Sequence, residues 1–214
     1  MGYKESTYQH WVSLDIQQPV WGHVFTVAPL VVIGTKEGNH YDLAPKHMVT
    51  PLGLRNYFGF VCTPAHATYH NVQKEKAFTV SFIRPNQIVL ASLAATPRCG
   101  LEIEEKSVVQ ALPTMAASSV DALFLRDSYF LLECKLEKIV DGFGGYSLIG
   151  GQIIAAHIHE EDARYSEKDD AQLIYQNPLL AYLADGRFSE IRHTYEFPFP
   201  KDFVAQPKEN TPDD

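Results

Sequence analysis

The chain has 214 residues, of which 45% are hydrophobic and 21% are charged, and its formal net charge is -8. This composition is ordinary for a soluble globular protein. The negative charge argues against nucleic acid as the main partner, because phosphate binding needs a clustered positive surface. No apolar run approaches the roughly 20 residues that cross a bilayer, and the start of the chain lacks the apolar core of a signal peptide. The three cysteines are scattered and form no CxxC pair, which favours reduced thiols. We therefore expect a cytoplasmic protein with no membrane partner.

The sequence predicts one folded domain with an extension at each end. Residues 1–19 are expected to form an N-terminal arm, and residues 20–197 the domain. Residues 198–214 are rich in Pro, Lys, Asp and Glu and have little to bury, so we expect a flexible C-terminal tail. No internal repeat divides the chain.

Strands dominate the predicted domain. They are indicated by apolar or alternating runs that are rich in β-branched and aromatic residues. The expected strands are residues 24–35, 40–44, 55–62, 78–83, 128–139 and 148–159. The turn after the first strand contains Gly38, which supplies the positive φ of a tight turn. The third strand is apolar on both sides, as a central strand would be. In the fifth, Glu133, Lys135 and Glu137 share one side, which we expect to face water.

Helical signals are few and short. Residues 67–76 and 86–95 can each make two or three turns, while residues 120–126 and 179–184 are weaker helical candidates. Many strands with short helices between them predict a mainly β fold, a β-barrel, because closure removes exposed sheet edges. A doubly wound parallel sheet is disfavoured, since it needs regular strand–helix alternation.

The common catalytic signatures are missing. No GxGxxG follows a strand, and no Walker A loop, GxSxG elbow or HExxH occurs. His157 and His159 share one face of a strand and could bind a metal ion together; the simpler interpretation is a strand end that turns polar. Cys62 lies near His66 in sequence, but buried cysteines are usually inert. We therefore assign neither a metal site nor a catalytic side chain.

The most informative stretch is residues 40–71. Pro45 lacks an N–H donor, so the segment Leu43–Pro45 should be extended and open-edged, with backbone groups available to a flat heterocycle. Thr68 begins a short helix, whose free amides attract a phosphate. An irregular polar loop with an ordinary threonine cap explains the same residues equally well. The hydroxyl and basic side chains of the stretch include Thr50, Thr63, Thr68, Lys46, His47 and His66.

In their order and spacing, several segments resemble the flavin reductase-like, FMN-binding split-barrel family. The resembling segments are residues 29–38, 42–45, 66–72, 78–82, 131–136, 149–158 and 178–188. Together they span roughly residues 20–192. The resemblance implies a split barrel, a homodimer and a flavin at the dimer interface.

The resemblance also implies roles for individual residues. Leu43–Pro45 would line the isoalloxazine, Thr68 would reach the phosphate, and Asn71 matches by type but could simply cap or brace the loop. His47 and Met48 stand where the family usually has serines. The full set of expected cofactor-binding residues is Leu43, Ala44, Pro45, Lys46, His47, Met48, Thr50, Thr63, Thr68 and Asn71.

Asp42 departs from the family too, because it replaces the usual asparagine of the Asn-Leu-Ala-Pro segment. An aspartate changes the available hydrogen bonds and adds a negative charge. The departures at residues 42, 47 and 48 bear on flavin specificity more than on the fold.

Three hypotheses about function follow. The first is an oxidoreductase that holds FMN, with FAD a less favoured cofactor, and transfers hydride from NADH or NADPH to the flavin. The reduced flavin would then serve a partner monooxygenase or another electron acceptor. The second is an FMN-binding electron-transfer or small-molecule-binding flavoprotein without direct reductase activity. The third is a split-barrel module that has lost its flavin, since one fold hosts several functions.

Overall fold

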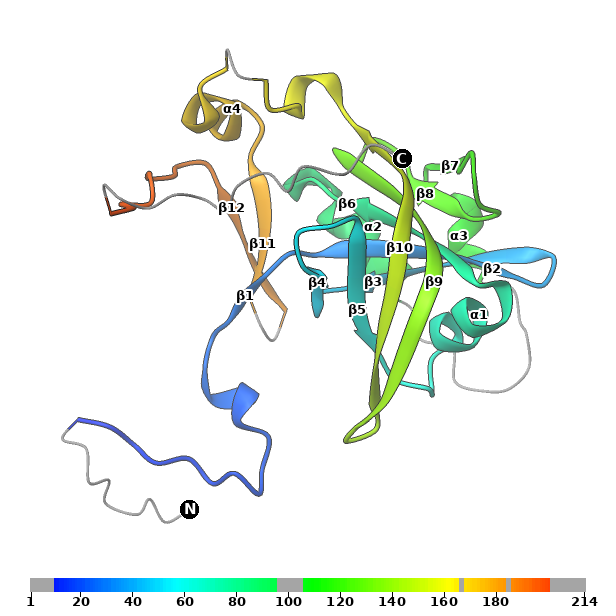
Figure 1. Ribbon diagram of the computed structural model, residues 1–214, viewed down its shortest axis with the longest axis horizontal. Helices are drawn as coiled ribbons and strands as arrows, with labels where there is room; N and C mark the ends of the chain where they lie inside the picture. The colour runs from blue at the N-terminus through cyan, green and yellow to red at the C-terminus, as the bar shows by residue number, and fades with distance from the viewer. Residues whose placement is uncertain (1–9, 96–105, 166–167, 184–185, 201–214) are drawn as a thin grey trace, which may run out of the picture.

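A computed structural model describes residues 10–95, 106–165, 168–183 and 186–200 (Figure 1). Most of the expected C-terminal tail, the first nine residues of the expected arm, and Cys99 lie outside the described residues. The main body is a curled antiparallel sheet of seven strands in the order β3-β2-β6-β9-β10-β5-β4. Its strands are β2 (Val31–Glu37), β3 (His40–Lys46), β4 (Val49–Pro51), β5 (Tyr57–Cys62), β6 (Ala77–Phe82), β9 (Phe130–Phe143) and β10 (Tyr146–Ile158).

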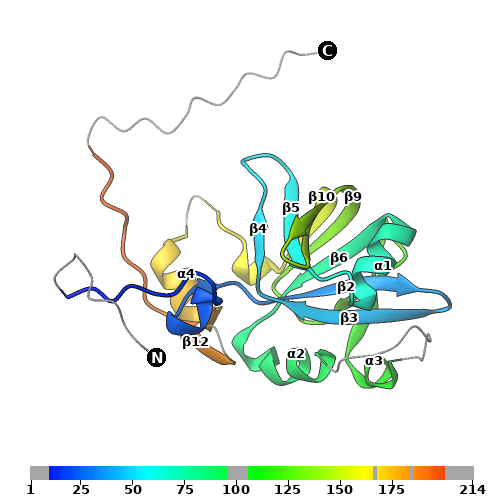
Figure 2. The ribbon, with the colours of Figure 1, turned by 90° about the horizontal axis from the view of Figure 1, so that it is seen from below.

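Two smaller sheets accompany the seven-stranded one. One joins β1 (Val27–Ala28), β11 (Leu179–Leu183) and β12 (Arg187–Ile191), and the other joins β7 (Thr114–Ala116) and β8 (Leu123–Leu125). The helices are α1 (Ala67–Glu75), α2 (Ile88–Ala94), α3 (Ser107–Ala111) and α4 (Asp170–Gln176), with 3-10 turns at η1 (Val20–His23), η2 (Pro85–Gln87) and η3 (Glu160–Asp162). In Figure 2, the N-terminal segment, α4 and β12 lie to one side of the seven-stranded sheet.

Strand β2 is buried on both faces and separates two hydrophobic cores. Val31 and Ile33 belong to the core inside the curl, which is filled by aromatic residues of β5 and β6 and closed by α1. Val32 belongs to a second core, between β2, β3 and the helices α2 and α3. Gly34 lets β8 approach β2 closely, because a Cβ at this position would lie 2.0 Å from the carbonyl oxygen of Leu123.

The mainly β split-barrel prediction is confirmed: the sheet curls into a half-barrel, and β3 and β4 are its two edges. Three details of the sequence-based assignment are wrong. The expected strand at residues 24–35 is two strands, β1 and β2, which belong to different sheets. Residues 120–126 and 179–184 were expected to be helical, but β8 and β11 are strands because each pairs with a neighbouring strand.

Candidate functional site

The two edges of the seven-stranded sheet are joined by only two residues. β3 ends at Lys46, β4 begins at Val49, and His47 and Met48 connect them. Three Cα steps span at most about 11 Å, so the curl of the sheet brings its own edges together at this connection. We call this region, where β3 and β4 meet, the seam. The expected cofactor-binding residues between 43 and 50 therefore lie along the seam.

Strand β3 forms one side of the seam. Among the described strands it pairs with β2 alone, with Ala44 opposite Ile33 and Pro45 opposite Val32. The side chain of Leu43 is fully buried in the second core, and Ala44 is buried as well. What Leu43 and Ala44 can offer at the seam is therefore mainly their backbone. The expectation of an extended edge around Pro45 is confirmed.

A positive charge lies where β3 meets the start of α1. The Nζ atom of Lys46 is 3.5 Å from Nδ1 of His66, the residue that immediately precedes α1. Burial, and then the positive charge of Lys46, lower the pKa values of both His66 and His47. Both imidazoles are thus driven toward their neutral form, so that Lys46 supplies the cationic charge of this part of the seam.

Helix α1 adds its N-terminus to the same part of the seam. We call this place, where Lys46 and His66 meet the start of α1, the corner. The first amides of a helix have no intrahelical acceptor and carry partial positive charge. The side chain of His66 makes no capping hydrogen bond to them. Thr63 organises the approach to the helix, because its carbonyl oxygen accepts from the amide of His66 at 3.0 Å and its hydroxyl from the amide of Ala65 at 3.3 Å. An ammonium group beside a helix N-terminus is suited to an anion.

Two expected site residues attach α1 to the sheet through buried hydrogen bonds. The hydroxyl of Thr68 is buried and donates to Oδ2 of Asp42 at 3.4 Å. The amide of Asn71 is also buried and donates to the hydroxyl of Thr35 at 3.0 Å. Asn71 thus braces α1 against β2.

The connection between β3 and β4 carries an aromatic contact. The His47 ring stacks on the ring of Tyr182 in β11, with centroids 4.8 Å apart and an interplanar angle of 29°. Met48 is about half-exposed, and its carbonyl accepts from the amide of Val61 at 2.9 Å, which ties the connection to β5. Thr50 is exposed on β4. The three-stranded sheet of β1, β11 and β12 therefore contacts the seam through Tyr182.

Sequence reasoning missed two residues near these positions. Lys106, which precedes α3, is buried, and its ammonium lies 3.2 Å from Oδ1 of Asp42. Tyr182 was assigned to a helix, and nothing in its sequence surroundings indicated a contact with His47. Both contacts join segments that are far apart in sequence, so no local motif could have revealed them.

Glu133 differs from expectation as well. It was expected to face water, but its side chain is fully buried. The carboxylate accepts hydrogen bonds from the amides of Ser118, Ser119 and Val120 and from the Ser118 hydroxyl. A loop therefore covers what alternation along β9 had indicated as the polar side of the strand.

The alternative sites that the sequence raised have other partners. His157 lies 3.6 Å from Glu133, and His159 lies 3.7 Å from Asp162, so the two imidazoles face different carboxylates. Within the described ranges, no cluster of three or more metal-binding side chains occurs. Burial raises the pKa of the Cys62 thiol, which disfavours a thiolate nucleophile. Nor does any described helix have the length and apolarity needed to span a membrane.

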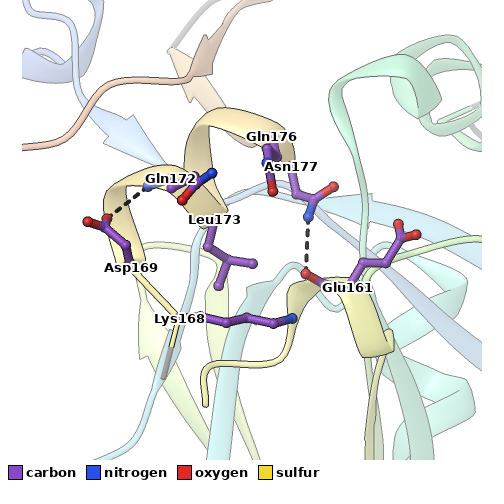
Figure 3. A pocket seen from close by; sticks show the side chains of 7 residues that line it. All are labelled: Glu161, Lys168, Asp169, Gln172, Leu173, Gln176 and Asn177. Carbon is purple, nitrogen blue, oxygen red and sulfur yellow. Dashed lines mark hydrogen bonds between the residues drawn. The ribbon is translucent and has the colours of Figure 1, made fainter. Parts of the chain in front are cut away.

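A hollow lies beside α4 (Figure 3). Its residues are Glu161, Lys168, Asp169, Gln172, Leu173, Gln176 and Asn177. The carboxylate of Asp169 caps α4 by accepting from the amide of Gln172, and the Asn177 side chain donates to the carbonyl of Glu161. These polar groups hold the helix in place, and none of the expected cofactor-binding residues lines the hollow.

The curled antiparallel half-barrel, with a cationic corner at the meeting of its edges, defines a protein of the split-barrel class. The family described as "Flavin reductase like domain" matches residues 24–187. This chain belongs to the flavin reductase-like family.

Solved structures of other proteins share this fold. The 2-nitrobenzoate 2-nitroreductase of Pseudomonas fluorescens is 17% identical, with a TM-score of 0.71 over 91% of this chain and 96% of that one. An FMN-binding protein from Thermus thermophilus is 18% identical, with a TM-score of 0.68 over 90% and 99% of the two chains. The flavin reductase component of a bacterial two-component tryptophan halogenase is 17% identical, with a TM-score of 0.60 over 78% and 91%. No curated protein matches this sequence.

Proposed function

We propose that this protein binds FMN at the seam and acts as an oxidoreductase that moves hydride or electrons between NADH or NADPH, the flavin and a downstream acceptor. The observation that carries the proposal is the corner at which Lys46, His66 and the N-terminus of α1 meet the edge strand β3. The chemistry of these groups fits the cofactor, since FMN combines an anionic phosphate with a flat heterocycle. When bound, FMN supplies the hydride and electron transfer.

The phosphate end is assigned to the corner. Lys46 contributes the charge, and Thr63 shapes the approach to the helix. Thr68 contributes its backbone amide, because its hydroxyl hydrogen is donated to Asp42 and is not available to a phosphate. Asn71 acts indirectly, by bracing the helix that presents these amides.

The ring end is assigned to the seam. The backbone of Leu43–Pro45 lies along the edge strand, where it can meet the rim of a flat ring. His47 and Met48 lie at the junction of the two edges, and Thr50 offers an exposed hydroxyl on β4. His47 and Met48 replace the serines that the resemblance led us to expect, and they give this protein its own contacts with the ring.

Titration with FMN tests the binding site directly. Lys46→Gln removes the charge at the corner, and a charge-assisted hydrogen bond contributes about 1.5–3 kcal/mol, so the Kd for FMN should rise about tenfold or more. Lys74→Gln is the matched control, because Lys74 is exposed on the last turn of the same helix and its loss should leave the Kd unchanged. A wild-type protein that fails to take up FMN or FAD would refute the proposal, and a tighter Kd for FAD would overturn the choice of FMN.

The reductase activity has its own assay. Purified protein with FMN should oxidise NADH or NADPH faster than flavin alone does. The stack of His47 on Tyr182 favours a second candidate function, because an aromatic pair at the seam could limit access of a nicotinamide to the ring. That candidate is an FMN-binding electron-transfer or small-molecule-binding flavoprotein, and tightly retained FMN without nicotinamide oxidation would select it. Steady oxidation of NADH or NADPH would instead support the reductase, and a partner monooxygenase would then be a candidate acceptor for the electrons.

We also propose a homodimer, with the second copy covering the apolar side chains of both chain ends. Trp11, Trp21, Phe25, Tyr195 and Phe197 are each about 70% exposed or more, on segments that extend away from the seven-stranded sheet (Figures 1 and 2). At about 200 Å² per aromatic side chain, they offer about 750 Å², close to the ~800 Å² per partner of a stable interface. Sedimentation should give a dimer, and a monomer at micromolar concentration would refute this.

The free, buried Cys62 and Cys134 support a reducing compartment such as the cytoplasm.

A further inference from the structure

Lys106 is buried next to the seam, and the function proposed so far gives it no role. The side chain of Lys106 is only 7% exposed. Its ammonium lies 3.2 Å from Oδ1 of Asp42, 2.9 Å from the carbonyl oxygen of Leu43 and 2.6 Å from the carbonyl oxygen of Ala94. Each of these oxygens can accept a hydrogen bond from the ammonium group.

The acceptors of Lys106 belong to segments that meet at the seam. Ala94 ends α2, while Asp42 and Leu43 belong to the edge strand β3. The second carboxylate oxygen of Asp42 accepts from the hydroxyl of Thr68 in α1. A continuous chain of buried polar contacts therefore runs from α2 through β3 to the start of α1.

This chain of contacts links the two ends of the proposed flavin site. Lys106 binds the carbonyl of Leu43, which lies in the strand assigned to the ring. Asp42 binds Thr68, which lies in the helix assigned to the phosphate. A buried charge is costly unless it is paired, and removing one partner of a buried pair is strongly destabilising. The charge of Lys106 is thus matched to the aspartate that stands where the family resemblance predicts asparagine.

We propose that Lys106 and Asp42 are positioning residues of the flavin site. The ion pair fixes the separation between the edge strand and the start of α1, so that ring and phosphate are bound at the same time. This inference rests on the proposed function, because it assumes that flavin binds at the seam. Neither residue needs to touch the cofactor.

A double-mutant cycle tests the pair. Lys106→Met and Asp42→Asn should each raise the Kd for FMN about tenfold or more, since each removes one partner of a buried ion pair. The combined variant removes both charges and leaves an amide that can still accept from Thr68. Its Kd should rise much less than the product of the two single increases. A rise equal to that product would mean that the residues do not act as a pair, and would overturn the proposal.

Two further measurements separate positioning from a purely structural role. The visible circular dichroism of FMN at saturation should change in the single variants, because the ring would bind in an altered position, whereas a smaller folded fraction would leave it unchanged. Arg84→Met is the control: Arg84 forms a bidentate, largely buried ion pair with Asp162 elsewhere in the fold. It should lower the melting temperature and keep the Kd for FMN within twofold of wild type.

The outcomes distinguish this inference from the proposed function. Failure of the wild-type protein to bind flavin would refute the proposed function itself. Wild-type binding, with Kd values and visible spectra unchanged in the single variants, would overturn the positioning role alone. If Lys106→Met does not fold, Asp42→Asn and the combined variant still test the proposal. Weaker binding and an altered spectrum in Asp42→Asn, both restored in the combined variant, would support it, and unrestored binding would overturn it.

Discussion

Replacing Glu133 by glutamine perturbs one buried carboxylate while nearly preserving its volume. The carboxylate accepts from the Ser118 amide at 3.1 Å, the Ser118 hydroxyl at 2.7 Å, the Ser119 amide at 2.5 Å and the Val120 amide at 3.0 Å. A glutamine keeps one acceptor oxygen and turns an NH₂ group toward the remaining donors. If two of the four hydrogen bonds are lost, at about 1.5 kcal/mol for each bond to a charged group, the free energy of unfolding should fall by about 3 kcal/mol.

The loss should depend on pH. Burial raises the pKa of Glu133, but the hydrogen bonds from Ser118, Ser119 and Val120 together outweigh it and leave the pKa below its usual value. A carboxyl group with a lowered pKa in the folded state contributes its stability above its unfolded pKa of about 4.3. That contribution is lost as pH falls through the folded pKa. The difference between wild type and Glu133→Gln should therefore be full at pH 7 and shrink below about pH 4.

Thermal unfolding followed by circular dichroism measures the effect. For a chain of this size, about 3 kcal/mol corresponds to a fall in melting temperature of roughly 6–12 °C. Glu137→Gln is the matched control, since Glu137 is exposed on the same strand and its replacement should change the melting temperature by less than about 2 °C. Equal melting temperatures for the two variants, or a difference that persists unchanged at acid pH, would refute the reasoning.

Two more predictions concern the packing of the core. Gly34→Ala should destabilise the protein by about 2 kcal/mol or more, because its Cβ would meet a carbonyl oxygen at 2.0 Å, whereas Gly22→Ala, with no atom within 4 Å of its added Cβ, should be nearly neutral; similar denaturation midpoints would contradict this. In a Cys99→Ser background, Cys62 and Cys134 should resist thiol reagents at pH 8, because burial raises both pKa values, that of Cys134 to about 12. Labelling faster than global unfolding would show that the thiols are accessible in the native state.

Much of the fold could be predicted because the strands of the main sheet carry clear local patterns. The alternation at residues 128–139 and the apolar run at residues 55–62 correspond to β9 and β5. The failures lie at short apolar segments. The run at residues 179–183 has no periodicity that separates a strand from a helix, and it is a strand because β1 and β12 pair with its two sides. Glu133 was misassigned because alternation indicates a side of the strand but not whether a loop covers it.

The residue types of the candidate site could be predicted from the sequence, but their arrangement in space could not. The basic residues and the edge strand around Pro45 stand out locally, because a proline limits hydrogen bonding wherever it occurs. The seam is a property of sheet order, which places β3 and β4 at opposite edges although only His47 and Met48 separate them in sequence. Lys106 was unpredictable, since its contacts with Asp42 depend on how α2 and α3 cover the strand.

The pairing of β1 with β11 has a consequence for how the protein is made. Val27 lies opposite Leu183, so β1 is synthesised long before β11, the strand that it pairs with. Contacts between such distant segments close slowly. Until then, β1 and the exposed Trp21 and Phe25 beside it have no completed sheet next to them, so we expect this part of the fold to form last.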